Sequence, residues 1–335
     1  LLLISSFAGL RKTEALSLYT SGRFYAALGE DELCIDRFKS AIDRGSDVID
    51  LENTYKRLLM QLFGSQQNFS PILDEALQQF PESWSLTTYR LVILAVQGNA
   101  DAEHRLKNIA VSGSNHGYGK FLSSAYRNLG IRHYEGNDFD KAAKAFRLSL
   151  HHRSTQRTHQ SLALTLFKLG EIRQAEQKWE AAIDAYREAL QANPEFAATY
   201  AKLGVLLRSL NRNEEAVTVY EKALEHLDMP VFYHNMAAAK LTQGDVKGAI
   251  DAYNRAIDMG IDFIYSYLIL GQLYENSGQN NEKQIDLYRR ALQSDLKGDS
   301  DEIYMDLGSR LERLGYPADA AIAYQKALDK NPAHQ

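Results

Sequence analysis

The chain has 335 residues, of which 45% are hydrophobic and 24% are charged, with 21 glycines and 6 prolines scattered along it. This composition excludes a disordered or fibrous protein. The net charge of −5 argues against a globally basic surface for nucleic acid, and the single cysteine excludes an internal disulfide.

The first ten residues, LLLISSFAGL, are largely apolar, do not begin with methionine, and are followed by Arg11 and Lys12. Two interpretations stay open: the end of a removed membrane span or signal region, or an apolar first helix cut from a longer protein. We expect residues 1–14 to be an N-terminal stub or capping segment. We expect the protein to be cytoplasmic, or to be membrane-tethered if this segment is the end of a removed membrane span.

Residues 15–112 contain three segments with a weak repeating pattern. The first, LYTSGRFYAALGEDELCIDRFKSAI (18–42), is the clearest. Two divergent segments follow, at 50–81 and 84–112, and they keep Gly64, Ala76, Pro81, Gly98 and Ala110. From Gly22 to Gly130 the distance is 108 residues, or three periods of 36, which supports three repeating units in this region.

A glycine-rich stretch, SGSNHGYGK (112–120), comes next, and we expect residues 113–122 to form a hinge loop. The stretch differs from a phosphate-binding loop because its glycine spacing is wrong and Phe121 stands where a metal-binding Ser or Thr is needed. Nucleotide binding is therefore not predicted.

A regular repeat runs through residues 123–335. Leu-Gly or Met-Ala pairs begin at Leu129, Leu169, Leu203, Met236, Leu270 and Leu307, with spacings of 40, 34, 33, 34 and 37. A small residue follows each pair at a fixed distance, except that the fifth unit needs one extra turn residue and then has Gln284 there. Four residues later comes an aromatic: Phe146, Tyr186, Tyr220, Tyr253, Tyr288 and Tyr324.

This pattern resembles the tetratricopeptide repeat, a helix–turn–helix of 34 residues. The best matches are YAKLGVLLRSLNRNEEAVTVYEKAL (200–224) and YMDLGSRLERLGYPADAAIAYQKALDKNP (304–332). The resemblance implies an all-α, right-handed superhelical solenoid of about nine units, because one unit cannot bury its own apolar face. The units begin near residues 15, 50, 84, 123, 163, 197, 230, 264 and 301.

Two insertions lengthen the repeating units that contain them. They are HHRSTQRTHQ (151–160) in the fourth unit and LKGDS (296–300) in the eighth. We expect such insertions to fall on connecting loops.

The family resemblance implies a concave groove lined by the first helix of each unit. The groove candidates are Arg127, Asn128, Tyr134, Lys168, Glu171, Arg208, His234, Asn235, Gln272, Glu275, Met305 and Arg313. Each one alone is also explained as an ordinary solvated side chain, but as a set they suit a peptide or protein partner. The family's two-carboxylate clamp is not predicted, since residues such as Val205 and Tyr265 stand at its positions.

Basic charge is concentrated in residues 123–162, which hold seven basic and three acidic residues, between two acidic flanks. The basic residues are Arg127, Arg132, Lys141, Lys144, Arg147, Arg153 and Arg157. They favour a partner with an acidic segment.

The sequence predicts no catalytic residues, cofactor or metal. It contains no serine elbow, no His-Glu-x-x-His and no catalytic acidic pair. His151, His152 and His159 have no cysteine or carboxylate partner at a metal-ligand spacing, so we interpret them as solvated loop side chains.

We therefore predict a non-catalytic scaffold that binds a protein or peptide. The alternative is a regulatory or recruiting arm of a larger membrane-anchored protein or enzyme, for example one of polysaccharide synthesis or export. Because no polar helix follows the last unit, self-association through that end is a further alternative to continuation of the chain.

Overall fold

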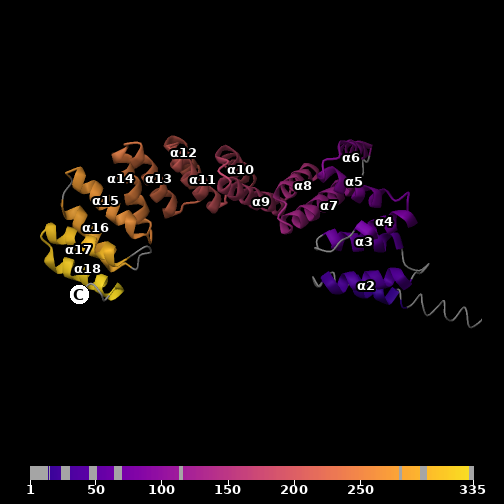
Figure 1. Ribbon diagram of the computed structural model, residues 1–335, viewed down its shortest axis with the longest axis horizontal. Coiled ribbons are helices and arrows are strands. Elements are labelled where there is room, and N and C mark those ends of the chain that lie inside the picture. The colour runs from indigo at the N-terminus through magenta and orange to yellow at the C-terminus, as the bar shows by residue number, and fades with distance from the viewer. Residues whose placement is uncertain are drawn as a thin grey trace, which may run out of the picture. The chain divides into compact units, whose positions relative to one another are not determined.

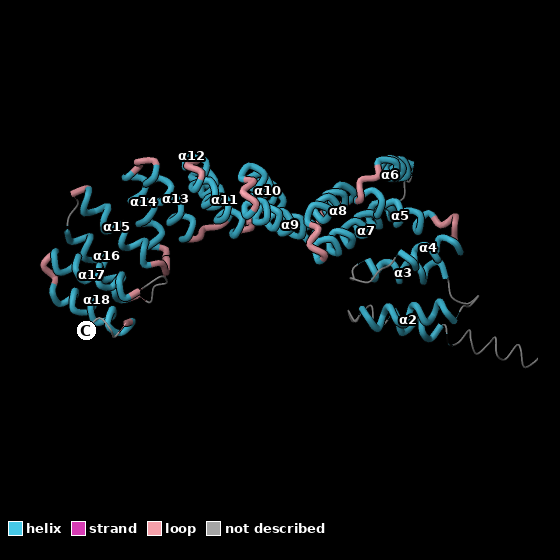
Figure 2. Tube along the Cα trace, viewed as in Figure 1, coloured by secondary structure: helices cyan, strands magenta, loops and turns pink. Residues whose placement is uncertain are grey.

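The computed structural model describes residues 14, 16–23, 31–44, 51–63, 70–112, 116–278, 281–294 and 300–331. The secondary-structure elements in these ranges are α-helices joined by short loops (Figure 2). None of the described helices is both long enough and apolar enough to cross a lipid bilayer. The predicted segment 1–14 lies outside the described residues except for Glu14.

The chain divides into two compact units near Lys178. Unit 1 comprises residues 1–178 and 191–193, and unit 2 comprises 179–190 and 194–335. The helices of unit 1 are α2 (Asp31–Arg44), α3 (Leu51–Phe63), α4 (Ser70–Gln79), α5 (Trp84–Val96), α6 (Ala100–Ser112), α7 (His116–Glu135), α8 (Phe139–His152) and α9 (Gln156–Ala175).

Unit 2 holds most of α10 (Trp179–Ala192) and all later helices. These are α11 (Ala197–Ser209), α12 (Asn213–His226), α13 (Pro230–Thr242), α14 (Val246–Asp258), α15 (Ile264–Asn276), α16 (Asn281–Gln293), α17 (Asp301–Arg313) and α18 (Pro317–Lys330).

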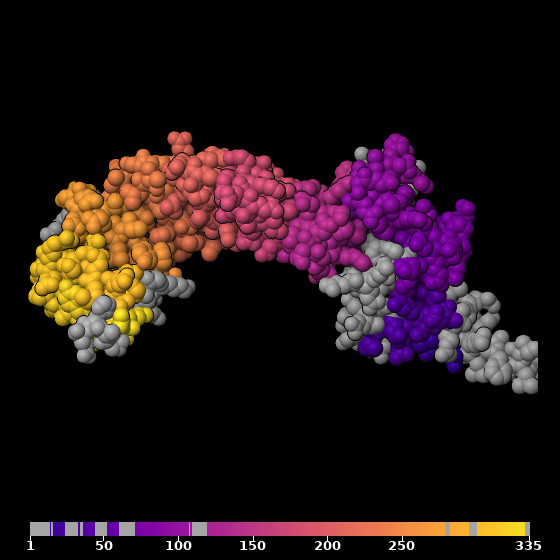
Figure 3. Space-filling view, in the orientation of Figure 1, coloured from indigo at the N-terminus to yellow at the C-terminus, as the bar shows by residue number. Residues whose placement is uncertain are grey.

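Helices that follow each other in the sequence pack as pairs. In unit 2 the pairs are α11 with α12, α13 with α14, α15 with α16, and α17 with α18, and each pair contacts the next (Figure 1). Within this unit the colour changes steadily from one end to the other in Figure 3, so sequence neighbours are also neighbours in space. We call the odd-numbered members from α7 to α17 first helices and the even-numbered members from α8 to α18 second helices. The all-α repeat fold predicted from the sequence is confirmed.

Four of these pairs are held by an aromatic ring on the second helix that lies over a glycine on the first, whereas α13 has Ala237 at the glycine position. A Cβ atom placed on Gly130 of α7 would be 2.8 Å from ring carbons of Phe146 on α8. Glycines of α11, α15 and α17 would collide in the same way with the aromatic of their partner helix. Phe146 is only 1% exposed, so glycine is required for the two backbones to approach this closely.

Gln284 takes the small-residue position of α16, as the alignment with one extra turn residue predicts. It is 2% exposed, and its amide donates hydrogen bonds to the carbonyl oxygen of Gly271 (3.1 Å) and to the hydroxyl of Tyr288 (3.3 Å). The buried amide is therefore satisfied, which explains how a polar side chain fits a position otherwise filled by alanine.

The turns between first and second helices share one backbone feature that the sequence analysis missed. Asn137, Gln177 and Asn211 have φ angles of 59°, and Gly244 and Gly315 occupy the corresponding places with φ of 83° and 85°. This left-handed conformation favours glycine and asparagine, which explains why those residues recur in the turns.

The predicted hinge loop at 113–122 is wrong for its second part, because α7 begins at His116 and residues 116–122 are helical. The insertion at 151–160 is likewise mostly helix, since α8 continues to His152 and α9 begins at Gln156. The extra residues lengthen the first helices: α7 and α9 have 20 residues, whereas α11 has 13. The insertion at 296–300 lies outside the described residues except for Ser300.

We expect Gly130→Ala to destabilise unit 1, because the new methyl group would meet the buried ring of Phe146. Overpacking costs about 1–3 kcal/mol, and the better helix propensity of alanine offsets roughly 1 kcal/mol of that cost. Thermal unfolding followed by circular dichroism measures the change.

Gly119→Ala in the same helix is the matched control. A Cβ atom there would meet only the carbonyl oxygen of His152 at 3.5 Å, which is an ordinary contact. We expect this variant to be neutral or slightly stabilised. Equal melting temperatures for the two alanine variants would contradict the packing argument.

Candidate functional site

All twelve predicted groove residues lie on first helices. Unit 1 carries Arg127, Asn128 and Tyr134 on α7 and Lys168 and Glu171 on α9. Unit 2 carries Arg208 on α11, His234 and Asn235 on α13, Gln272 and Glu275 on α15, and Met305 and Arg313 on α17. None is fully buried. The first helices are also spatial neighbours within each unit, α7 beside α9 and α11 beside α13. We call the exposed side of these helices the first-helix face.

In unit 1 the structure brings together Tyr134, Lys168 and Glu171. The Lys168 ammonium donates to the Glu171 carboxylate over 2.9 Å, and this hydrogen bond raises the pKa of Lys168. The ring of Tyr134 packs edge-on against Phe139, with ring centroids 5.3 Å apart. The Lys168 charge is thus compensated within the chain.

Arg127 differs from Lys168, because no carboxylate of the described residues lies within ion-pair distance of it. Burial lowers its pKa, and the positive charge of Arg157 on α9 lowers it further. Arg157 has no carboxylate partner among the described residues either. Two neighbouring guanidinium groups without a counter-ion favour an anionic ligand.

The predicted basic segment is partly neutralised by the fold. Lys141 pairs with Asp138 at 2.6 Å, and Lys144 pairs with Glu103 at 2.7 Å and also donates to the carbonyl oxygen of Ala95. These two lysines therefore stabilise unit 1 and have less charge to offer a partner than the sequence count suggests.

In unit 2 the first cluster surrounds His234. Its Nδ1 shares a hydrogen bond of 2.8 Å with the hydroxyl of Ser266 on α15. Its ring packs edge-on against Tyr253 at 5.4 Å and against Phe263 at 5.2 Å. Burial lowers the pKa of His234 to about 4, and the nearby positive charge of Arg208 contributes to this shift. The imidazole is therefore neutral near pH 7.

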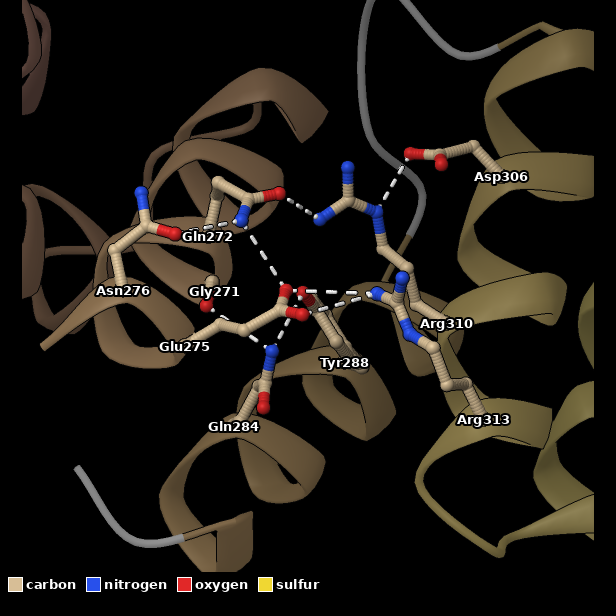
Figure 4. A network of polar contacts seen from close by, with 9 residues as sticks. All are labelled: Gly271, Gln272, Glu275, Asn276, Gln284, Tyr288, Asp306, Arg310 and Arg313. Carbon is tan, nitrogen blue, oxygen red and sulfur yellow. Dashed lines mark hydrogen bonds and ion pairs between the residues drawn. The ribbon is translucent and has the colours of Figure 1, made fainter. Parts of the chain in front are cut away.

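The second cluster connects α15 and α17 (Figure 4). Arg310 donates to Asp306 over 2.8 Å and to the amide oxygen of Gln272 over 2.7 Å, and Arg313 pairs with Glu275 at 3.3 Å. Gln272 in turn donates to Glu275 over 3.2 Å. Three predicted groove residues, Gln272, Glu275 and Arg313, thus belong to one network, and its centre is Arg310, which the sequence analysis did not select.

Exposed apolar side chains lie on the same helices, and most of them were not predicted from the sequence. Each first helix of unit 2 has one: Val205 on α11 (50% exposed), Val231 on α13 (38%), Tyr265 on α15 (42%) and Met305 on α17 (39%). Only Met305 was predicted. Exposed apolar side chains beside polar ones are typical of surfaces that bind other proteins.

The prediction that His151, His152 and His159 lie on a loop is wrong. His151 and His152 belong to α8 and His159 to α9. The ring of His152 is stacked on Tyr126, with centroids 5.6 Å apart and planes at 4°, and burial lowers its pKa to about 4. Within the described part of the chain, no group of three or more His, Cys, Asp or Glu side chains is arranged to hold a metal ion.

Paired helices joined by a glycine–aromatic contact define a helical-repeat protein. Two models of the tetratricopeptide repeat match the chain, over residues 154–229 and 234–300. These matches and the repeating helix pairs identify residues 154–229 and 234–300 as tetratricopeptide repeats. Members of this family are generally non-catalytic, and their fold fits a protein-interaction role.

Solved structures with the same kind of fold include MamA, which is 24% identical and aligns over 50% of this chain and 96% of its own with a TM-score of 0.40. PilF of Pseudomonas aeruginosa is 20% identical over 63% of this chain and 91% of its own, with a TM-score of 0.41. YrrB, a tetratricopeptide-repeat protein with an unusual peptide-binding site, is 16% identical over 57% and 95%, with a TM-score of 0.39. A search of curated protein sequences gave no match.

We expect acid to destabilise unit 2 partly through His234. Its pKa is 6.5 when unfolded and about 4 when folded, so the unfolded chain binds more protons between these values. The stability that neutral His234 contributes is therefore complete above pH 6.5 and is lost as the pH falls toward 4. We predict that the melting temperature of His234→Gln falls less than that of the wild type when the pH is lowered from 7 to about 4.

His226→Gln is the matched control, because His226 is exposed at the end of α12. Its melting temperature should follow the same pH dependence as the wild type. If His234→Gln also follows the wild-type curve, burial of the neutral imidazole does not contribute to the acid sensitivity.

Proposed function

We propose that the protein is a non-catalytic scaffold that binds a protein or peptide along its first-helix faces. One observation carries this proposal. In unit 2, successive first helices present an exposed apolar side chain together with polar groups, as Val205 and Arg208 do on α11. Helices of this kind are held rigidly by their second helices, which suits recognition of an extended segment.

The electrostatics favour a partner with an acidic segment. Arg127, Arg157 and Arg208 have no carboxylate partner among the described residues, although many other cations of the chain do. Unpaired cations on a binding face attract anionic partners and increase the association rate.

We expect a variant that carries both Arg127→Glu and Arg208→Glu to lose a partner that the wild type retains. Pull-down with each protein, read by mass spectrometry, identifies such a partner. The wild-type interaction should also weaken as the salt concentration rises, because exposed charges are screened.

A control variant with Lys222→Glu and Lys247→Glu changes the net charge equally. Both lysines are exposed on second helices, α12 and α14. We expect it to retain the partner. Loss of the partner from both variants, or from neither, would contradict binding by the first-helix faces.

A further inference from the structure

Arg208 lies on the first-helix face of unit 2 in surroundings that differ from those of Arg310 and Arg313. Arg310 and Arg313 are paired with carboxylates of the chain, as Figure 4 shows. Arg208 is half-buried and has no carboxylate within 4 Å among the described residues, and its Nε atom is buried without a hydrogen-bond partner. A partly desolvated guanidinium that lacks a counter-ion is costly to the free protein, and an anion would remove that cost.

The groups around Arg208 carry no negative charge, and each of them can donate a hydrogen bond, although a tyrosine hydroxyl can also accept one. Its charge acts on His234 and on the hydroxyl groups of Tyr220 and Tyr253. The hydroxyl of Tyr253 is buried and has no hydrogen-bond partner within the described residues. In the tautomer in which Ser266 donates to Nδ1 of His234, the proton is on Nε2, which is then a further donor.

Apolar surface adjoins this group of donors. Val205 precedes Arg208 by one helical turn on α11, and Val231 precedes His234 by one turn on α13. Phe263 contacts both His234 and Tyr265, with ring centroids 5.2 and 5.1 Å apart. Residues three apart lie on the same side of a helix, so the donors and the exposed apolar side chains share one surface.

We propose that Arg208 is a specific binding site for an acidic side chain, Asp or Glu, of a partner segment whose neighbouring residues are apolar. The guanidinium donates hydrogen bonds to the carboxylate and compensates its charge, His234 provides a further donor, and Val205, Val231 and Tyr265 contact the flanking apolar residues. This inference rests on the proposed function and specifies the chemistry recognised at one place on the face.

The probe is a capped peptide of alternating Glu and Leu, with an acetylated amino terminus and an amidated carboxyl terminus, titrated into the full chain by calorimetry. A capped Gln–Leu peptide measures the contribution of charge. We expect the Glu peptide to bind at least about tenfold more tightly than the Gln peptide, as a charge-assisted hydrogen bond in a partly desolvated site allows. Arg208→Gln should reduce this ratio to near one.

Arg187→Gln is the matched control, because Arg187 lies on the second helix α10 and its partner Glu215, on α12, also pairs with Arg212. It should keep the wild-type ratio. If Arg208→Gln fails to fold, Arg208→Lys replaces it and should lower the ratio at least threefold, since lysine cannot bind a carboxylate bidentately.

Three outcomes would overturn the inference. They are equal binding of the Glu and Gln peptides, no binding of either, or a ratio that Arg208→Gln leaves unchanged. A Gln–Leu peptide with a free carboxyl terminus that binds more tightly than the capped Glu peptide would assign the site to a chain end and would also overturn it. Equal binding of both peptides, lost from a Val205→Lys variant, would refute the carboxylate site and leave the proposed function standing.

Discussion

The contact between a glycine on the first helix and an aromatic ring on the second determines the rest of this structure. Where Gly130 lies under Phe146, the two helix backbones approach as closely as they can, and the ring is completely enclosed. The same contact recurs in unit 2 between Gly271 and Tyr288. Where it occurs, it fixes the rotation of the first helix about its axis, because the glycine can face the ring in only one orientation.

That orientation decides which side chains are left for binding. Since Gly204 faces Tyr220, Arg208 approaches this tyrosine and is half-buried, and Val205, one turn earlier on the same side of α11, is half exposed. The first-helix face, which is the proposed binding surface, is therefore a consequence of core packing. A change in the glycine–aromatic contact would alter the position of every side chain on that first helix, and it would affect binding as well as stability.

Much of the fold follows from the sequence because this contact leaves a spacing of about 34 residues that can be read directly. The unit that has Gln284 in place of alanine was aligned correctly for the same reason. The helical start of α7 was not predicted, because its glycines indicate a loop. There, packing of Phe121 against Tyr89, with ring centroids 4.8 Å apart, outweighs the low helix propensity of glycine. Threonine is a preferred helix N-cap, so Thr155 could have predicted the start of α9. The repeat spacing indicated an inserted loop there instead.

The periodicity of a single helix identifies which residues face outward, but it does not say which of them meet a neighbour. Gln272 and Arg310 are 38 residues apart and contact each other only because α15 and α17 lie side by side. Beside that contact, the ion pairs of Arg310 with Asp306 and of Arg313 with Glu275 compensate the positive charge at one end of the unit 2 face. Arg208, predicted from the same periodicity, has no carboxylate partner among the described residues. The distinction matters for function, since a paired arginine must lose its partner before it binds an anion, whereas Arg208 gains one. If the first-helix face binds a partner as proposed, its specificity is therefore determined by which cations the chain leaves unpaired.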